Sequence, residues 1–248
     1  SHFSWPYIFW INVPVGILTM IAGEKILPKD ITMSRNSIDK SGFGLFSVAI
    51  LTFFGGIFIG QEQGFLTWLP LVLIFVAIIA FIAFIQVEKR VAMPLITFSI
   101  FRNKIFTLSL FTALLIFSAN FFVNVVIPFY LQNARGLTPS VAGMLMMVFP
   151  LMMVIGSPIS GYLTDQVGPE ILVLIGLALL SITQLMYMFM NQHTPIWYYV
   201  VATAIMGLGN SLFQSPNNTM VMSSVTKENL GVAGSLNSFA RNLGMVLG

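Results

Sequence analysis

Long runs of apolar residues, separated by short connections, make up most of this chain. A helix needs about 20 predominantly apolar residues to cross the hydrocarbon core of a bilayer. On that criterion the pattern predicts eight membrane-spanning helices, over residues 5–22, 42–60, 67–87, 106–131, 139–163, 171–190, 196–222 and 230–248. The connections contain Pro, Gly or charged residues and leave no room for a soluble domain. The predicted fold class is therefore all-α, a polytopic bundle of transmembrane helices.

Side-chain amides interrupt two of these runs. Residues 196–222 contain four amides at helical spacing, and residues 106–131 contain two amides with an aromatic ring on the same face; they are Asn210, Gln214, Asn217 and Asn218, then Asn120, Asn124 and Phe117. Because polar groups are costly in lipid, we expect these side chains to line a substrate pathway or a protein interior. Phe117 could offer its π face to a cationic substrate. For Asn120 and Asn124, hydrogen bonds between helices explain the pattern equally well.

Composition removes several classes of protein from consideration. The chain is 57% hydrophobic and only 8% charged, whereas soluble domains carry about 25% charged residues. It has no cysteine, so disulfides and thiolate metal sites are excluded. The net charge of +3 comes without a basic patch interleaved with aromatics, so we expect no nucleic-acid partner. His2 and His193 lack companions at ligand spacing, so no metal site is expected.

The placement of Lys and Arg predicts the orientation of the helices. Nine basic residues fall in the connections 23–41, 88–105 and 223–229, whereas Arg135 is the one basic residue in the alternate connections. Short cytoplasmic loops carry the excess of Lys and Arg. We therefore assign those three connections, with 164–170, to the cytoplasmic side.

Residues 161–168 form a compact motif between two predicted spans. Gly161 would allow close approach of a helix, Asp165 could accept hydrogen bonds at a helix end, and Gly168 could turn the chain. The motif resembles the cytoplasmic gating-loop motif of the major facilitator superfamily. Pro169 and Glu170 stand where that family has basic residues, so we expect Asp165 to act as a helix-end acceptor rather than in a charge relay.

Further segments in order along the chain extend this resemblance; they are residues 5–16, 88–96, 136–143, 215–218, 231–234 and 240–244. Together they resemble the fourteen-span drug:proton antiporters of that superfamily, the EmrB/QacA type. The resemblance implies that residues 1–22 are the last span of an N-terminal half. Residues 23–105 would hold cytoplasmic connections and two extra central spans, and residues 106–248 most of the C-terminal half bundle. The chain would thus run from the sixth span through most of the eleventh helix of the core fold.

Arg241 is the one basic residue within a predicted span, two to three turns from its cytoplasmic start. A lone intramembrane charge is a candidate functional group, although a long side chain can also extend toward the interface. Gly244 and Gly248, four residues apart, predict close packing of this helix. No Asp or Glu lies deep in any predicted span. We therefore expect the proton-coupling carboxylate in a first half of the protein that this chain lacks.

The predicted function is secondary active transport in the plasma (inner) membrane, with proton-coupled efflux of hydrophobic or cationic drugs by alternating access. The partners would be the small-molecule substrate, the lipid bilayer and the N-terminal half of the same protein, with the proton gradient as energy source and no cofactor. A facilitator for another cargo, such as a lipid, siderophore or metabolite, remains an alternative. A membrane-embedded enzyme would need clustered His or carboxylates, and a purely structural or sensory bundle leaves the amides unexplained.

Overall fold

The computed structural model describes residues 10, 12–26, 39–91 and 94–248, and within these residues every regular element is helical. Residues 5–9, expected to open the first span, and much of the basic connection 23–41 lie outside them. The elements are α2 (Asn12–Ile26), α3 (Lys40–Gln63), α4 (Trp68–Glu88), η1 (Phe98–Arg102), α5 (Lys104–Phe129), η2 (Tyr130–Ala134), α6 (Pro139–Met146), α7 (Val148–Val167), α8 (Pro169–Met188), α9 (Ile196–Ser223), η3 (Lys227–Asn229) and α10 (Leu230–Leu247). The fold class is the all-helical one predicted.

Among the described residues, six spans are long and apolar enough to cross a membrane: Lys40–Gln63, Trp68–Glu88, Lys104–Ala134, Pro139–Val167, Pro169–Met188 and Ile196–Ser223. They correspond to six of the eight predicted spans. Of the first predicted span the structure describes the part in α2, which has 15 residues. The last predicted span is α10, whose 18 residues include Asn237, Arg241 and Asn242, and these polar side chains lower its hydropathy.

Prolines account for the irregular helix ends on one side of the bundle. Pro150 has no N–H to donate to the carbonyl of Met146, and the helix breaks there into α6 and α7 at Met147. Pro128 lies in the last turn of α5, after which the chain widens into the π turn η2, closed by the Arg135 N–H on the Tyr130 carbonyl at 3.0 Å. A helix that lacks one hydrogen bond per proline is easier to bend at that point.

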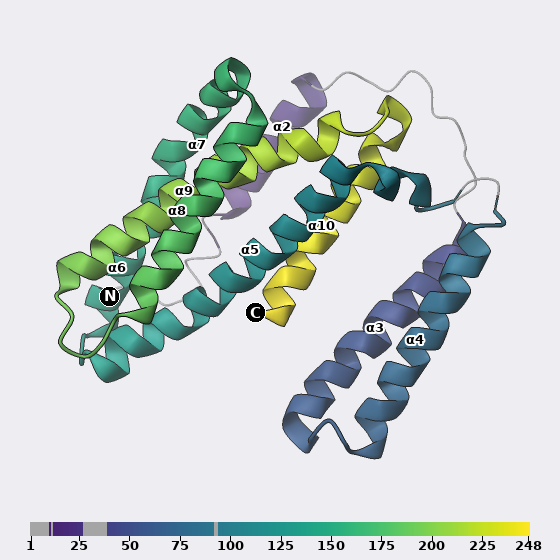
Figure 1. Cartoon of the computed structure of the whole chain (residues 1–248), viewed down its shortest axis with the longest axis horizontal. Helices are drawn as coiled ribbons and strands as arrows, with labels where there is room; N and C mark the ends of the chain where they lie inside the picture. The colour runs from purple at the N-terminus through teal and green to yellow at the C-terminus, as the bar shows by residue number, and fades with distance from the viewer. Residues whose placement is uncertain (1–9, 11, 27–38, 92–93) are drawn as a thin grey trace.

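Helix α9 lies at the centre of the main bundle (Figure 1). Half of the residues in its most apolar 18-residue stretch are buried, whereas the buried share of that stretch is 11–28% in the other spans. It packs on α7 and α8 along most of its length and touches α5 and α10. Glycines permit these contacts: a Cβ on Gly176 of α8 would lie 2.7 Å from the Phe213 backbone nitrogen, and one on Gly207 would lie 2.7 Å from the Phe149 carbonyl oxygen.

Helices α5 and α10 form the second close pair of the bundle. A Cβ added to Gly244 would collide with the Leu114 carbonyl, and one added to Gly248 with the Ser118 carbonyl. The two glycines predicted to favour packing therefore lie at this crossing. At the end assigned as cytoplasmic, the Asn103 amide donates to the Ser224 carbonyl at 2.9 Å, and it also caps α5 by accepting from the Ile105 N–H.

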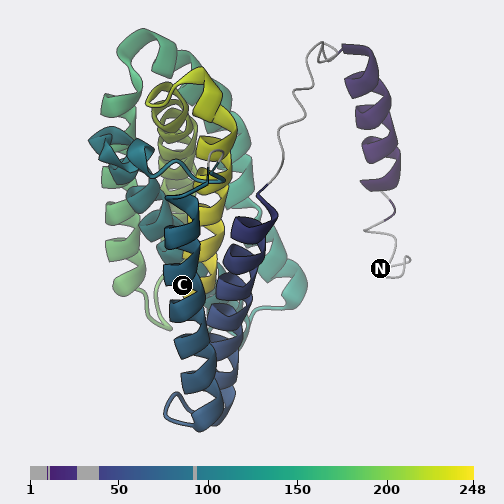
Figure 2. The same ribbon diagram turned by 90° about the vertical axis from the view of Figure 1, so that its right-hand side faces the viewer.

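Helices α3 and α4 form a hairpin beside this bundle (Figure 1). In their most apolar 18-residue stretches only 17% and 22% of the residues are buried, as expected for helices that face lipid. Their contact with the bundle includes Phe46 of α3 and Phe239 of α10, whose ring centroids are 5.8 Å apart. Helix α2 has no buried residue among those described, and Figure 2 shows it apart from the other helices.

Glu88 differs from its sequence-based assignment to the connection 88–105. It is the last residue of α4, its side chain is only 3% exposed, and one carboxylate oxygen accepts the Ile96 backbone N–H at 3.2 Å. The buried carboxylate thus ties the hairpin to the segment that leads into α5. The sequence placed it correctly near the membrane boundary but gave no sign of its burial.

We predict that Gly244→Ala destabilises the full-length protein. The added methyl must push α10 away from the Leu114 carbonyl, and overpacking of this kind costs about 1–3 kcal/mol. The check is the thermal unfolding midpoint in detergent, with Gly231→Ala as the matched control, because nothing lies within 4 Å of a Cβ at Gly231 on the same helix. Equal midpoints for the two variants would contradict the packing argument.

Candidate functional site: an amide-lined cavity between α5, α7, α9 and α10

Four helices surround a cavity of about 200 Å³ that we name the amide cavity. Helices α5 and α9 supply its amides, α7 supplies an aromatic ring and a thioether, and α10 closes one side with a methionine. Its lining residues are Phe117, Asn120, Phe121, Asn124, Phe149, Met153, Asn210, Gln214 and Met245. The structure therefore brings together Phe117 and four of the six amides predicted to line a pathway, although they come from two helices about 90 residues apart in sequence.

Two of these amides are buried without hydrogen-bond partners. Asn120 and Asn210 are each 5% exposed. The Nδ2 and Oδ1 atoms of Asn120 have no hydrogen-bond partner in the described part of the chain, and the Oδ1 atom of Asn210 accepts no hydrogen bond there. An unsatisfied buried polar group costs about 1–3 kcal/mol. Within the described residues the Asn120 side chain therefore makes no hydrogen bond to another helix.

Asn124 is arranged differently. Its Nδ2 donates to the Asn120 carbonyl at 2.9 Å, within the same helix. Pro128 cannot donate to the Asn124 carbonyl, so that carbonyl is free of its usual helical partner. Asn124 is one of the residues that line the amide cavity. The same residue also lines a small adjoining hollow that contains Tyr187, Tyr199 and Thr203.

The structure places the four amides of the predicted α9 stripe in different surroundings. Asn210 and Gln214 line the amide cavity, but Asn217 and Asn218 do not. Asn217 is 3% exposed with an unpartnered Oδ1, and it lies about 10 Å along the axis from Asn210. Asn218 lies about 80° around the helix from Asn210, where it is exposed and its Oδ1 accepts from Asn237 of α10. The four amides of α9 therefore lie in at least two different environments.

The electrostatics of the cavity also differ from expectation. The Arg241 guanidinium lies over the Phe117 ring, 5.8 Å from its centroid, and donates to the Ser238 hydroxyl at 3.3 Å. The π face expected to receive a substrate cation is thus occupied by the chain's own cation. No carboxylate lines the amide cavity among the described residues. The charge that the described residues place beside the cavity is the positive charge of Arg241.

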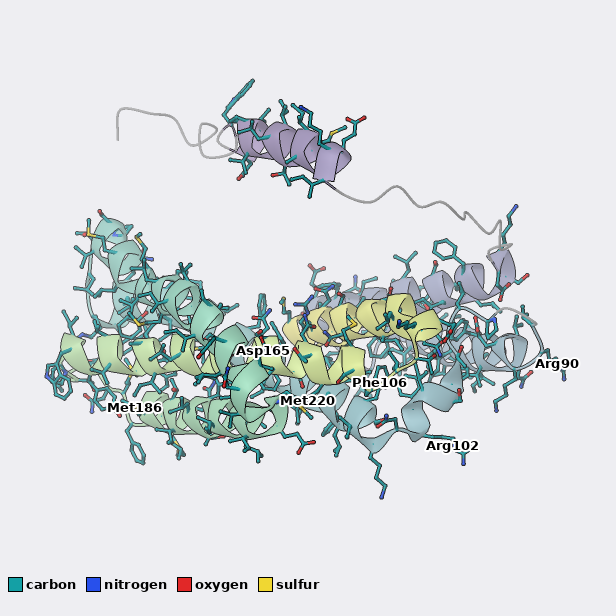
Figure 3. All side chains as sticks on the ribbon, turned by 90° about the horizontal axis from the view of Figure 1, so that it is seen from above. Arg90, Arg102, Phe106, Asp165, Met186 and Met220 are labelled. Atoms are coloured by element: carbon teal, nitrogen blue, oxygen red, sulfur yellow. The ribbon has the colours of Figure 1, made fainter. Side chains whose placement is uncertain are left out.

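The motif at 161–168 forms the turn between α7 and α8. Gly168 ends α7 with φ of +92°, a backbone conformation that favours glycine, so the predicted turn is present. The predicted close approach at Gly161 is not found, because nothing described lies within 4 Å of a Cβ there. Asp165, labelled in Figure 3, is exposed and receives no hydrogen bond from the described residues. It lies at the C-terminal end of α7, where the free backbone groups are carbonyls and cannot donate to a carboxylate.

Sequence reasoning did not identify the polar group behind the cavity. The Tyr187 hydroxyl of α8 lies 3.0 Å from the Thr203 hydroxyl of α9 and 3.6 Å from the Met206 sulfur. Thr203 and Met206 lie three residues apart on α9, but Tyr187 comes from α8, so no spacing along the sequence could pair its hydroxyl with them. Sequence reasoning also did not identify Phe149 and Met153. They are four residues apart on α7, and only the packing of α7 against its neighbours brings them to the amides of α5 and α9.

The chain as a whole matches the Major Facilitator Superfamily over residues 1–248 and belongs to it. It is 31% identical over its full length to the riboflavin transporter RibZ of Clostridioides difficile, covering 53% of that protein. It is 28% identical over its full length to the multidrug resistance protein Stp of Mycobacterium tuberculosis, covering 46% of it. It is also 30% identical to the tetracenomycin C resistance and export protein of Streptomyces glaucescens, with all of this chain and 46% of that protein covered. The chain thus spans about half the length of the curated relatives it matches.

Membership of this family, together with six candidate spans among the described residues, indicates that the chain belongs to an integral, multi-pass membrane protein. The branch of the family and the position of the chain within the whole protein stay predictions from the sequence.

The unpartnered amides lead to a stability prediction. Asn120→Leu removes two unsatisfied polar atoms while keeping a similar side-chain volume, so the unfolding midpoint of the full-length protein should stay the same or rise. Asn218→Ala, in contrast, deprives the Asn237 donor of its acceptor and should cost about 1 kcal/mol. Thermal unfolding in detergent measures both. A large loss of stability in Asn120→Leu would mean that Asn120 serves packing or a hydrogen bond instead.

Proposed function

We propose that this chain, as part of a major facilitator, contributes one wall of the substrate site in a secondary active exporter. The whole protein would move hydrophobic or cationic organic compounds outward across the plasma membrane by alternating access, in exchange for protons. The observation that carries the proposal is the meeting of unpartnered amides from α5 and α9 at one cavity. Natural proteins keep such costly groups mainly where function requires them.

The helices that carry these amides are also the ones loosened by proline. Pro128 lies one turn from Asn124 on α5, and Pro216 lies two residues from Gln214 on α9. Discontinuous or bendable helices around a midplane site are typical of secondary transporters. In the proposed cycle, bending at these prolines would change how closely Asn120 and Asn210 approach each other, and a bound substrate would supply their missing hydrogen bonds in one of the two states.

Proton coupling has to come from outside the amide cavity. Among the described residues no Asp or Glu lines it, and the buried acid Glu88 lies at the end of α4, beside the connection into α5. A proton-coupled cycle needs a titratable group that is reached from both sides of the membrane. We therefore place the coupling carboxylate in the part of the whole protein that this chain does not include.

A second candidate substrate class is a planar, amide-bearing heteroaromatic compound. Amide side chains pair with imide and amide groups through both donors and acceptors, Phe117 and Phe149 offer flat surfaces, and Arg241 favours electron-rich ligands. The relative named as a riboflavin transporter agrees with this chemistry. The two candidates differ in substrate charge, which makes them separable.

Transport by the full-length protein in proteoliposomes tests the proposal. With an imposed proton gradient we expect directed movement of ethidium or of riboflavin, reduced at least tenfold by Asn120→Leu combined with Gln214→Leu. Gln63→Leu is the matched control, because Gln63 is exposed at the end of α3, away from the cavity. Gradient-independent movement would reject proton coupling, and transport unaffected by the double substitution would reject the amide cavity as part of the site.

Arg241 should set the charge preference. Replacing it by Gln keeps hydrogen-bond donors but removes a positive charge beside Phe117. At about 7 Å and an effective dielectric constant of about 20, repulsion of a substrate cation amounts to about 2 kcal/mol. We expect Arg241→Gln to raise the ratio of ethidium to riboflavin transport about 30-fold, measured as initial rates in the same vesicles, whereas Arg241→Lys should leave the ratio nearly unchanged. A ratio unaffected by Arg241→Gln would place Arg241 outside substrate recognition.

A further inference from the structure

A second cavity, of about 300 Å³, lies where the α3–α4 hairpin meets the bundle, and we name it the phenylalanine pocket. Elements from three parts of the chain form it: the hairpin, the short helix η1 with α5, and α10. Aromatic rings dominate the wall, among them Phe46, Phe84, Phe101, Phe111 and Phe239. No amide or charged side chain lines it. Its chemistry is therefore unlike that of the amide cavity, and it suits a saturated hydrocarbon chain.

The depth of the pocket is set by positions along the helices. Phe46 is six residues after Lys40 at the start of α3, Phe84 is four residues before the end of α4, and Leu110 is six residues after the start of α5. At 1.5 Å per residue, these side chains lie about 6–9 Å from their helix ends. That depth is level with the upper acyl chains of the leaflet whose headgroups surround those ends.

The helix ends around the pocket form a basic rim. Lys40, Lys89, Arg90, Arg102 and Lys104 are all exposed there, and Arg102 directly follows the pocket residue Phe101. Figure 3 shows Arg90 and Arg102 extending outward at the same end of the molecule.

Two acidic residues that the structure describes beside the rim, Asp39 and Glu88, accept backbone hydrogen bonds. Glu88 is buried and accepts the Ile96 N–H. Asp39 caps α3 by accepting the Ser41 N–H at 3.0 Å, and its other oxygen is buried. The exposed charge at the rim is therefore positive.

We propose that the phenylalanine pocket is a binding site for one anionic phospholipid of the leaflet on the basic side. An acyl chain would fill the space between hairpin and bundle, and the phosphate would lie at the rim near Arg102 and Lys104. Lys and Arg next to membrane-spanning helices attract anionic headgroups, and the apolar wall accepts the chain. The lipid would join the hairpin to the bundle, where direct contact among the described residues includes the Phe46–Phe239 ring pair. This inference does not depend on what the protein transports.

The test uses the full-length protein purified in mild detergent, with phosphatidylglycerol and phosphatidylcholine added in separate arms. Native mass spectrometry counts bound lipids, and thermal unfolding measures the stabilisation. We expect phosphatidylglycerol to bind at least fivefold more tightly and to raise the unfolding midpoint further. Arg102→Gln combined with Lys104→Gln should abolish that preference, whereas Lys227→Gln, which removes an exposed cation from the α9–α10 connection, should retain it.

A second variant and a photoreactive lipid address the pocket itself. Leu243→Trp should fill the cavity from α10 and reduce retention of both lipids at least fivefold. Phosphatidylglycerol with a diazirine in its acyl chain should label peptides that contain Phe46 or that lie within residues 81–114 or 236–243. Labelling elsewhere, or lipid binding that is equal for both headgroups and unaffected by the rim variant, would overturn the proposal.

Discussion

The close approach of α9 to its neighbours is the contact on which the rest of this structure depends. Half of the residues in the most apolar 18-residue stretch of α9 are buried. The crossing with α8 brings Gly176 against the α9 backbone near Phe213. In a membrane, helices gain little from the hydrophobic effect when they associate, so close van der Waals packing through small residues has to hold them together. Because α9 is fixed in this way, Asn210 and Gln214 are held at a defined position opposite α5.

That rigid placement explains how the chain tolerates groups that do not contribute to its stability. Asn120 and Asn210 remain without partners in a part of the protein where polar groups are expensive. The surrounding helices are bound to one another through glycine contacts and through hydrogen bonds at their ends, such as Asn103 to Ser224 and Tyr130 to Asn191. The bundle is thus tied near both membrane boundaries, while its middle, with Pro128 and Pro216, keeps unsatisfied amides and weakened backbone hydrogen bonding. A site of this kind can change shape without loss of the fold.

The two cavities divide the chemistry of the chain between them. The amide cavity combines hydrogen-bonding groups with a cation and aromatic rings, which suits a compact organic solute. The phenylalanine pocket has a hydrocarbon-like wall below a basic rim, which suits a lipid. The α3–α4 hairpin contributes to the second cavity and not to the first. Its position beside the bundle therefore bears on how the protein is held in the bilayer rather than on what it carries.

The sequence by itself determined the features that depend on local pattern. Apolar runs predicted the spans that became α3 to α9, because crossing a bilayer requires a minimum apolar length. Gly168 predicted a turn, and Gly244 and Gly248 predicted a close crossing, since these follow from the properties of the residue itself. Tertiary structure alone decided which polar residues meet. It brought Asn120 and Asn210 to one cavity and placed Arg241 over the Phe117 ring. It also directed Asn218 toward Asn237 and buried Glu88. Helical spacing fixes the angle of a side chain around its own axis, but the rotation of each helix against its neighbours is set by packing between segments far apart in the sequence.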